Sequence, residues 1–187
     1  MTELFSFLIS VAAAAVLGNA AAKNYKGNRG RTITAFTVIT AVVYLVIAFF
    51  YGEFEKTLKG IIFCLILLYA SYEDIKIREA ENYLHIMIVI TAFIGCEFNK
   101  AVFMIIPALI MGLIFHIGFL VSKNFKIGGA DIKLSVACAF MLGWQSFFAL
   151  IIGLTAAVII NLLKRQGEKA FPLIPYLAVG FMTAYFI

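Results

Sequence analysis

Eight runs of mostly apolar residues, separated by short breaks that contain charged residues or glycine, make up nearly the whole sequence. A transmembrane helix needs about 20 consecutive apolar residues, and backbone groups in lipid must be hydrogen-bonded internally. We therefore expect every run to be a helix, and we predict an all-α transmembrane bundle with about eight spans in a single domain, 1–187. The expected spans are 4–22, 32–51, 57–74, 82–98, 101–122, 131–143, 145–163 and 171–187.

The composition excludes a soluble domain. Apolar residues make up 64% of the chain, charged residues only 13%, and the mean hydropathy is +1.03. Soluble proteins average about 45–50% apolar and about 25% charged residues. The chain has no extramembrane mass to hold nucleic acid, so the lipid bilayer is the expected partner. The three cysteines form no Cys-x-x-Cys pair, and we expect no metal and no cofactor.

Residues 131–163 allow two readings. Their 33 residues are few for two crossings of about 17–25 residues each. The Gly143-Trp144-Gln145 break favours a turn with Trp144 at the membrane interface, whereas one long tilted helix is the alternative.

The distribution of Lys and Arg predicts the orientation of the bundle. With two helices in 131–163, one face carries twelve of these residues and the opposite face carries three, namely Lys56, Lys59 and Lys100. With one helix the ratio falls to nine against six. Because cytoplasmic loops carry the excess of basic residues, the sharper contrast favours eight spans with both termini outside. The basic residues of the first face are Lys23, Lys26, Arg29, Arg31, Lys76, Arg78, Lys123, Lys126, Lys133, Lys164, Arg165 and Lys169.

Asp74 and Asp131 are the only aspartates among ten acidic residues. Asp74 ends the third expected span and Asp131 opens the sixth, so two crossings separate them and both lie on the basic face. Two carboxyl groups at such a boundary can share one proton: the ionised group then accepts a proton from water, and the protonated group donates to a peptide carbonyl oxygen. The residues alone also allow Asp131 to be a helix N-cap and Asp74 to be a hydrated interfacial residue.

The segment before Asp131 contains two glycines, Gly128 and Gly129. Glycine permits close approach of a bound peptide or backbone conformations that other residues avoid. These glycines are therefore candidates for substrate binding beside Asp131.

Three segments resemble the type IV prepilin peptidases, a family of membrane aspartic proteases. Gly128-Gly129-Ala130-Asp131-Ile132-Lys133 is similar to the family's Gly-x-Gly-Asp-x-Lys segment, and the segment 69–82 is similar to the one with the other catalytic aspartate. The segment 171–180 resembles the family's closing helix. The resemblance implies that Asp74 and Asp131 are catalytic, with Gly128, Gly129, Lys133, Asn82 and Glu73 as substrate-binding or supporting residues.

The resemblance implies the substrate as well as the chemistry. It implies type IV prepilin-like or pseudopilin precursors, in which a short basic leader is followed by an apolar helix. It also implies that the leader is cleaved off at the cytoplasmic boundary of a prokaryotic plasma membrane. The larger family members carry a zinc-binding insert after the first helix and methylate the new N-terminus. The corresponding loop here, 23–31, has nine residues and no cysteine, so we expect neither zinc nor methyltransferase activity.

Two departures from the family pattern bear on the site. Ala130 replaces the second glycine of the Gly-x-Gly-Asp segment, and Glu81 replaces the usual proline before Asn82. Because alanine disfavours positive φ, the loop must reach Asp131 through another conformation or not need that freedom.

Other polar residues of this face have less specific interpretations. We expect leader cations to meet Glu73, Glu79 or Glu81, and Lys133 to contact a lipid phosphate or a loop carbonyl. His116, within the fifth span, is interpreted as a buried, hydrogen-bonded residue between helices.

A small proton-coupled transporter or channel that uses both aspartates as relay groups is the alternative function. Transporters tend to place such acids near the bilayer midplane within repeated halves. This sequence has acids at span ends and no visible repeat, which favours the peptidase.

Overall fold

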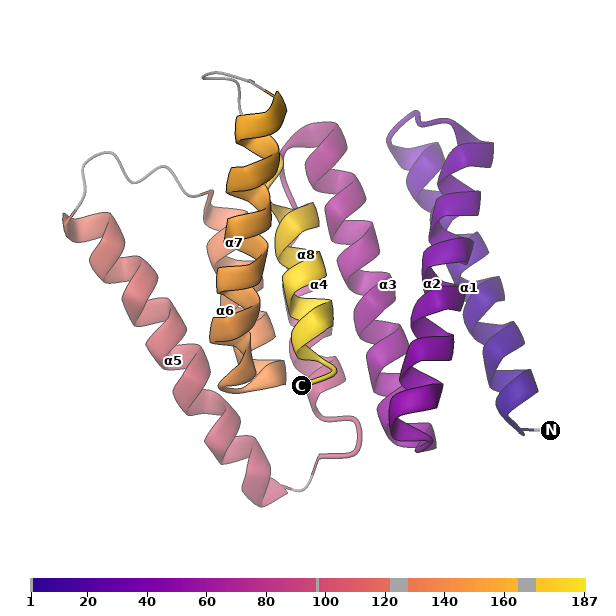
Figure 1. The fold of residues 1–187 in the computed structure, drawn as a ribbon, viewed down its shortest axis with the longest axis horizontal. Helices are drawn as coiled ribbons and strands as arrows, with labels where there is room; N and C mark the ends of the chain where they lie inside the picture. Colours follow the sequence, from indigo (N-terminus) through magenta and orange to yellow (C-terminus); the bar gives the residue numbers. More distant parts are fainter. Residues whose placement is uncertain (1, 97, 122–127, 165–170) are drawn as a thin grey trace.

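A computed structural model describes residues 2–96, 98–121, 128–164 and 171–187, and within these ranges the chain is all helical with no strand. Figure 1 shows helices that run alternately up and down. The all-α bundle predicted from the sequence is confirmed. The helices are α1 (Thr2–Asn24), α2 (Arg29–Tyr51), α3 (Phe54–Ile77), α4 (Asn82–Ala92), α5 (Phe98–Val121), α6 (Gly129–Leu142), α7 (Gln145–Lys164) and α8 (Ile174–Ala184).

The helices differ in their ability to cross a membrane. Four of those described, α1, α2, α5 and α7, are long and apolar enough to span it. Helices α4 and α8 have 11 residues each, which at about 1.5 Å per residue is shorter than the hydrocarbon core of about 30 Å. Both are shorter than the expected spans 82–98 and 171–187, because α4 ends at Ala92 and α8 begins only at Ile174.

The segment 131–163 forms two antiparallel helices, α6 and α7 (Figure 1). Gly143 ends α6 with a φ of +65°, which glycine adopts without a Cβ penalty. Trp144 follows in the turn and is exposed. The structure thus has the two helices with a turn at Trp144, and not the single long tilted helix.

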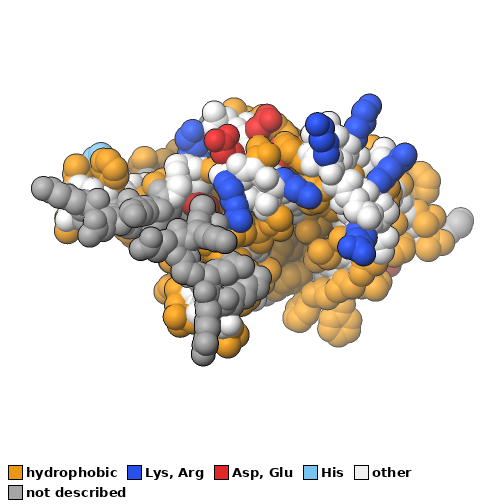
Figure 2. All heavy atoms as spheres, turned by 90° about the horizontal axis from the view of Figure 1, so that it is seen from above, with side chains coloured by type: hydrophobic (Ala, Val, Ile, Leu, Met, Phe, Trp, Pro, Cys, Tyr) orange, Lys and Arg blue, Asp and Glu red, His pale blue; other side chains and the backbone are white. Residues whose placement is uncertain are grey.

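Basic side chains gather at one end of the bundle, which we call the basic end. It comprises the α1–α2 and α3–α4 connections and the start of α6, and Figure 2 shows Lys and Arg side chains spread over it. Lys123, Lys126, Arg165 and Lys169 lie outside the described residues, as does the side chain of Lys164.

Helix α3 is the centre of the bundle and packs against α1, α2, α4 and α8. Its buried side chains include Phe63 and Leu67. Helices α7 and α8 approach very closely: a Cβ on Gly180 would lie 2.2 Å from the Ala149 carbonyl oxygen. Such close contacts through small residues are typical of membrane helices, and here they position α8 beside α3.

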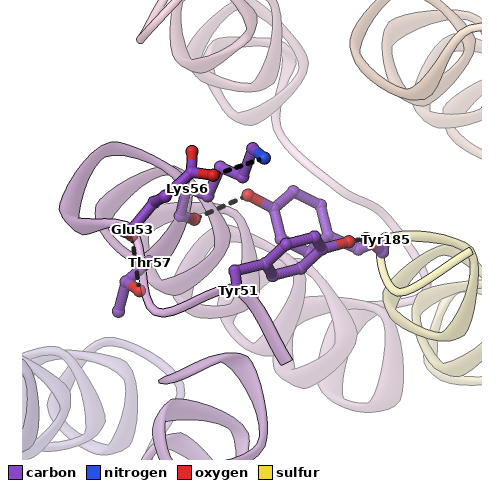
Figure 3. A network of polar contacts seen from close by, with 5 residues as sticks. All are labelled: Tyr51, Glu53, Lys56, Thr57 and Tyr185. Carbon is purple, nitrogen blue, oxygen red and sulfur yellow. Dashed lines mark hydrogen bonds and ion pairs between the residues drawn. The ribbon is translucent and has the colours of Figure 1, made fainter. Parts of the chain in front are cut away.

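Hydrogen bonds from two tyrosines connect helices at the opposite end of the bundle (Figure 3). The Tyr51 hydroxyl of α2 donates to the Tyr185 carbonyl oxygen at the end of α8. The Tyr185 hydroxyl donates in turn to the Lys56 carbonyl oxygen of α3 at 2.6 Å. These bonds join α2, α3 and α8 at the end remote from Asp74.

Candidate functional site

Asp74 lies in the last turn of α3, at the basic end. Its side chain is only 7% exposed, and its Oδ2 accepts a hydrogen bond of 2.9 Å from the Ile174 N–H at the start of α8. The Leu173 N–H also donates to this carboxyl group. Because the first N–H groups of a helix have no partner within the helix and favour a negative charge, the start of α8 holds the Asp74 carboxylate in place.

Asp131 lies in the first turn of α6 and is half-buried. Its carboxyl group accepts a hydrogen bond from the Gly128 N–H. A Cβ on Gly128 would lie 2.9 Å from Asp131 Oδ2, whereas one on Gly129 would have no neighbour within 4 Å. The missing side chain of Gly128 therefore makes room for the Asp131 carboxyl group.

The charge of Asp74 influences the protonation of Asp131. Both lie outside the four helices that are able to span the membrane. Burial raises the pKa of Asp131, and the negative charge of Asp74 raises it further. Burial also raises the pKa of Asp74, although the Ile174 N–H and the charge of Arg78 partly oppose this. The charge of Asp74 thus acts on Asp131, and a carboxyl group near a second negative charge retains its proton to a higher pH than an isolated carboxyl group does.

The glycine segment does not use positive φ. Gly128 has φ −63° and ψ 143°, and Ala130 is already helical. The alanine at position 130 therefore causes no backbone strain, and the second glycine of the family pattern is not needed here for its conformational freedom.

Asn82 and Lys133 meet beside this segment. The Lys133 ammonium group donates to Asn82 Oδ1 at 2.9 Å, joining the starts of α4 and α6. We expected a lipid phosphate or a loop carbonyl as the partner of Lys133, and the structure instead gives a side-chain amide. Both residues line an open cleft of about 540 Å³ whose remaining lining residues are Glu79, Ala80, Glu81, Tyr83, Gly129 and Ala130.

Glu73 faces away from this cleft and is fully buried. Its Oε1 accepts a hydrogen bond from the Tyr25 hydroxyl, and its Oε2 accepts one of 3.1 Å from the Glu81 N–H. Of the three acids expected to meet leader cations, only Glu79 and Glu81 expose their side chains. Glu73 instead stabilises the α3–α4 connection, through an N–H that a proline at position 81 would lack.

His116 is exposed on α5, not buried between helices as the sequence suggested. The buried residues of α5 that pack towards α6 are Ala108, Met111 and Phe115, and His116 is not among them. No group of three or more His, Cys, Asp or Glu side chains among the described residues is close enough to hold a metal ion.

The sequence reasoning missed the Ile174 N–H as a partner of Asp74. A signal for it was present: Pro172 and Pro175 flank Ile174, and proline near the first helical position marks a helix start with unpaired N–H groups. The sequence offered no comparable signal for the Tyr25–Glu73 contact.

One family of known proteins matches the chain. The model of the type IV leader peptidase family matches residues 61–163, more than half of the chain, and the match includes both Asp74 and Asp131. No curated protein and no solved structure matches the chain significantly.

Proposed function

Because the chain belongs to the type IV leader peptidase family, we propose that it is an aspartic endopeptidase that removes the short basic leader from prepilin-like or pseudopilin precursors. The observation that carries this proposal is the position of both aspartates at the basic end of the bundle, Asp74 in the last turn of α3 and Asp131 in the first turn of α6.

The contacts of the two carboxyl groups suggest their roles. Asp74 receives two backbone N–H groups and lies near the charge of Arg78, all of which stabilise its ionised form. The charge of Asp74 favours the protonated form of Asp131. We assign Asp74 as the base that takes a proton from water and Asp131 as the acid that donates to the peptide carbonyl oxygen. The water oxygen bonds to the carbonyl carbon, which gives a gem-diol, protonated Asp74 and ionised Asp131. Asp74 then passes its proton to the amide nitrogen, Asp131 takes back a proton from one gem-diol hydroxyl as the C=O bond re-forms, and the C–N bond breaks.

The cleft between the α3–α4 connection and the start of α6 is the proposed leader site. It begins at Gly129 and Ala130, directly before Asp131. Glu79 and Glu81 supply exposed negative charge for leader cations, while Lys133 is held by Asn82 at the other wall. Reversing both charges, with Glu79→Lys and Glu81→Lys, is expected to weaken cleavage of a basic leader. An unchanged rate would remove these two acids from the leader site.

The orientation proposal follows from charge. The chain is a multi-pass membrane protein with its basic residues gathered at the end that holds Asp74 and Asp131. Because cytoplasmic loops are enriched in Lys and Arg, we place this end in the cytoplasm of a prokaryotic cell, with the bundle in the plasma membrane. We also propose that residues 1–187 act as one peptidase domain without cofactor and without methyltransferase activity.

Co-expression with a prepilin-like substrate tests the central proposal. Asp74→Asn and Asp131→Asn keep the size of each side chain and remove its acid–base chemistry, so both should abolish processing. Glu53→Gln, an exposed acid at the opposite end of the bundle, is the matched control and should process normally. Processing by either Asn variant at the wild-type level would rule out the two-aspartate mechanism.

A further inference from the structure

An apolar groove of about 540 Å³ runs along α3, between α2 and α8. Both of these helices pack against α3, and the groove lies where they leave its surface uncovered. Ala35 and Ile39 lie on the α2 side, and Val179 lies on the α8 side; all three are exposed. The lining is almost wholly apolar, so water has few partners in it.

The two ends of the groove differ. At the end remote from the aspartates it reaches Phe186, whose ring stacks on Tyr51. The Tyr51 hydroxyl is bonded to the Tyr185 carbonyl oxygen there, so α2 and α8 are joined (Figure 3). At the basic end the groove reaches Ile75 and Pro175 instead. It therefore runs from a closed end towards the candidate active site.

The groove is continuous with the surroundings of Asp74. Leu67 and Ser71 line it, and together with Asp74 they follow the i, i+4, i+7 spacing of one helix face. On the other wall, Pro175 directly follows Ile174, whose N–H binds Asp74 Oδ2. Both walls thus lead to the same carboxyl group.

We propose that this groove binds the apolar helix that follows the cleavage site in the substrate. The proposal rests on the peptidase function proposed above and assigns a second substrate-binding surface to it. The lining residues of α3 extend from Cys64 to Ile75, about 17 Å at 1.5 Å per residue, which matches about 11 residues of a docked helix. A helix in this position has its start beside Asp74, where cleavage is proposed.

A second apolar groove, about 270 Å³ in volume, lies between α1, α3 and α4. Its α3 residues, Ile62, Leu65, Ile66 and Tyr69, belong to the opposite face of α3 from the Leu67–Ser71–Asp74 face. This smaller groove is therefore the internal comparison for the experiment.

Filling the larger groove tests the proposal. Val179→Trp places a bulky side chain in it, and Val158→Trp makes the same change on α7 at a similarly exposed position outside it; Met87→Trp fills the smaller groove. Each purified variant cleaves two substrates: a full precursor with its apolar helix, and a short peptide with the leader and cleavage site only. Val179→Trp should lower kcat/KM for the full precursor at least tenfold, mainly through KM, and leave the short peptide within twofold of wild type.

Several outcomes would overturn the proposal. One is normal cleavage of the full precursor by Val179→Trp, and another is an equal loss on both substrates, which would indicate damage near Asp74 or a structural lipid in the groove. A loss of the same size in Met87→Trp or Val158→Trp would show that the effect is not specific to the groove. Failure of the wild-type protein to cleave the precursor would instead refute the proposed function.

Photocrosslinking provides a test that does not depend on turnover. A photoreactive residue replaces Thr183 in the groove, or Val158 outside it, in the Asp131→Asn background so that bound precursor stays intact. We expect a crosslink to the apolar segment of the precursor from position 183 and none from position 158. Crosslinks to lipid alone from position 183 would overturn the proposal.

Discussion

The space beside Asp131 gives the sharpest mutational prediction. Gly128→Ala adds a Cβ that would lie 2.9 Å from Asp131 Oδ2, and contacts this short force one of the two groups to move. Gly128 has φ −63° and ψ 143°, which alanine adopts without strain. The backbone can therefore stay in place, and the Asp131 carboxyl group is the part that must turn away.

The size of the effect follows from that movement. Stability should change little because a carboxyl group at the end of a side chain can rotate at low cost. Catalysis should suffer more, because a displacement of about 1 Å at a reacting group can cost about a hundredfold in rate. We therefore expect Gly128→Ala to lower kcat/KM for precursor cleavage by about ten- to a hundredfold, equivalent to about 1.4–2.7 kcal/mol of transition-state stabilisation.

Gly129→Ala is the matched control. It makes the same change one residue later, at the first position of α6, where the new Cβ meets nothing within 4 Å. Alanine favours the helix over glycine by up to about 1 kcal/mol, so this variant should be at least as stable as wild type. The assay is kcat/KM together with the thermal melting temperature in detergent. Equal activities of the two variants would refute the steric argument.

Three further predictions concern the surroundings of the site. Glu81→Pro removes the N–H that binds the Glu73 carboxyl group, which should lower the free energy of unfolding by about 1.5–3 kcal/mol. Its melting temperature should therefore fall below that of Glu81→Ala, which keeps the N–H, and equal melting temperatures would contradict this. Arg78→Gln removes a charge that lowers the pKa of Asp74, so the acidic limb of the pH–rate profile, where Asp74 is protonated and no base remains, should move to higher pH. The shift should be less than about one pH unit because the exposed Arg78 is screened, and a shift to lower pH would contradict the assigned role of Arg78. Tyr51→Phe removes the hydrogen bond to the Tyr185 carbonyl oxygen, and the loss of about 1 kcal/mol of stability should lower the melting temperature. The kcat for the short leader peptide should stay unchanged because Asp74 lies at the other end of the bundle, and a lower kcat would contradict this independence.

The pH prediction depends on the sharing of one proton. Burial raises the pKa of both carboxyl groups, and the Asp74 charge raises that of Asp131 further. At low pH both groups are protonated and no base remains, whereas at high pH both are ionised and no acid remains. The rate maximum should therefore lie above the usual carboxyl range of about 4.

Much of the site could be predicted because its main features are local in the chain. The Gly128–Lys133 segment and the acid at position 74 are visible as short motifs, and the charge count places both aspartates on one face. The roles of Glu73 and Lys133 were harder to predict because their partners are distant in the sequence: Tyr25 lies in the α1–α2 connection and Asn82 at the start of α4. His116 shows the same limit, since its exposure depends on which side of α5 packs against α6.

The sequence by itself determined the helical composition, the basic end and the position of both aspartates at helix ends, because hydrophobic run length and charge act locally along the chain. The tertiary structure decided which groups surround those aspartates. The Ile174 N–H binds Asp74, which lies 100 residues away in the sequence. Gly128 leaves room for the Asp131 carboxyl group, whose direction depends on the position of α6 in the bundle. Such contacts depend on how helices pack against one another, and hydrophobic runs and charge counts along the chain do not specify that packing.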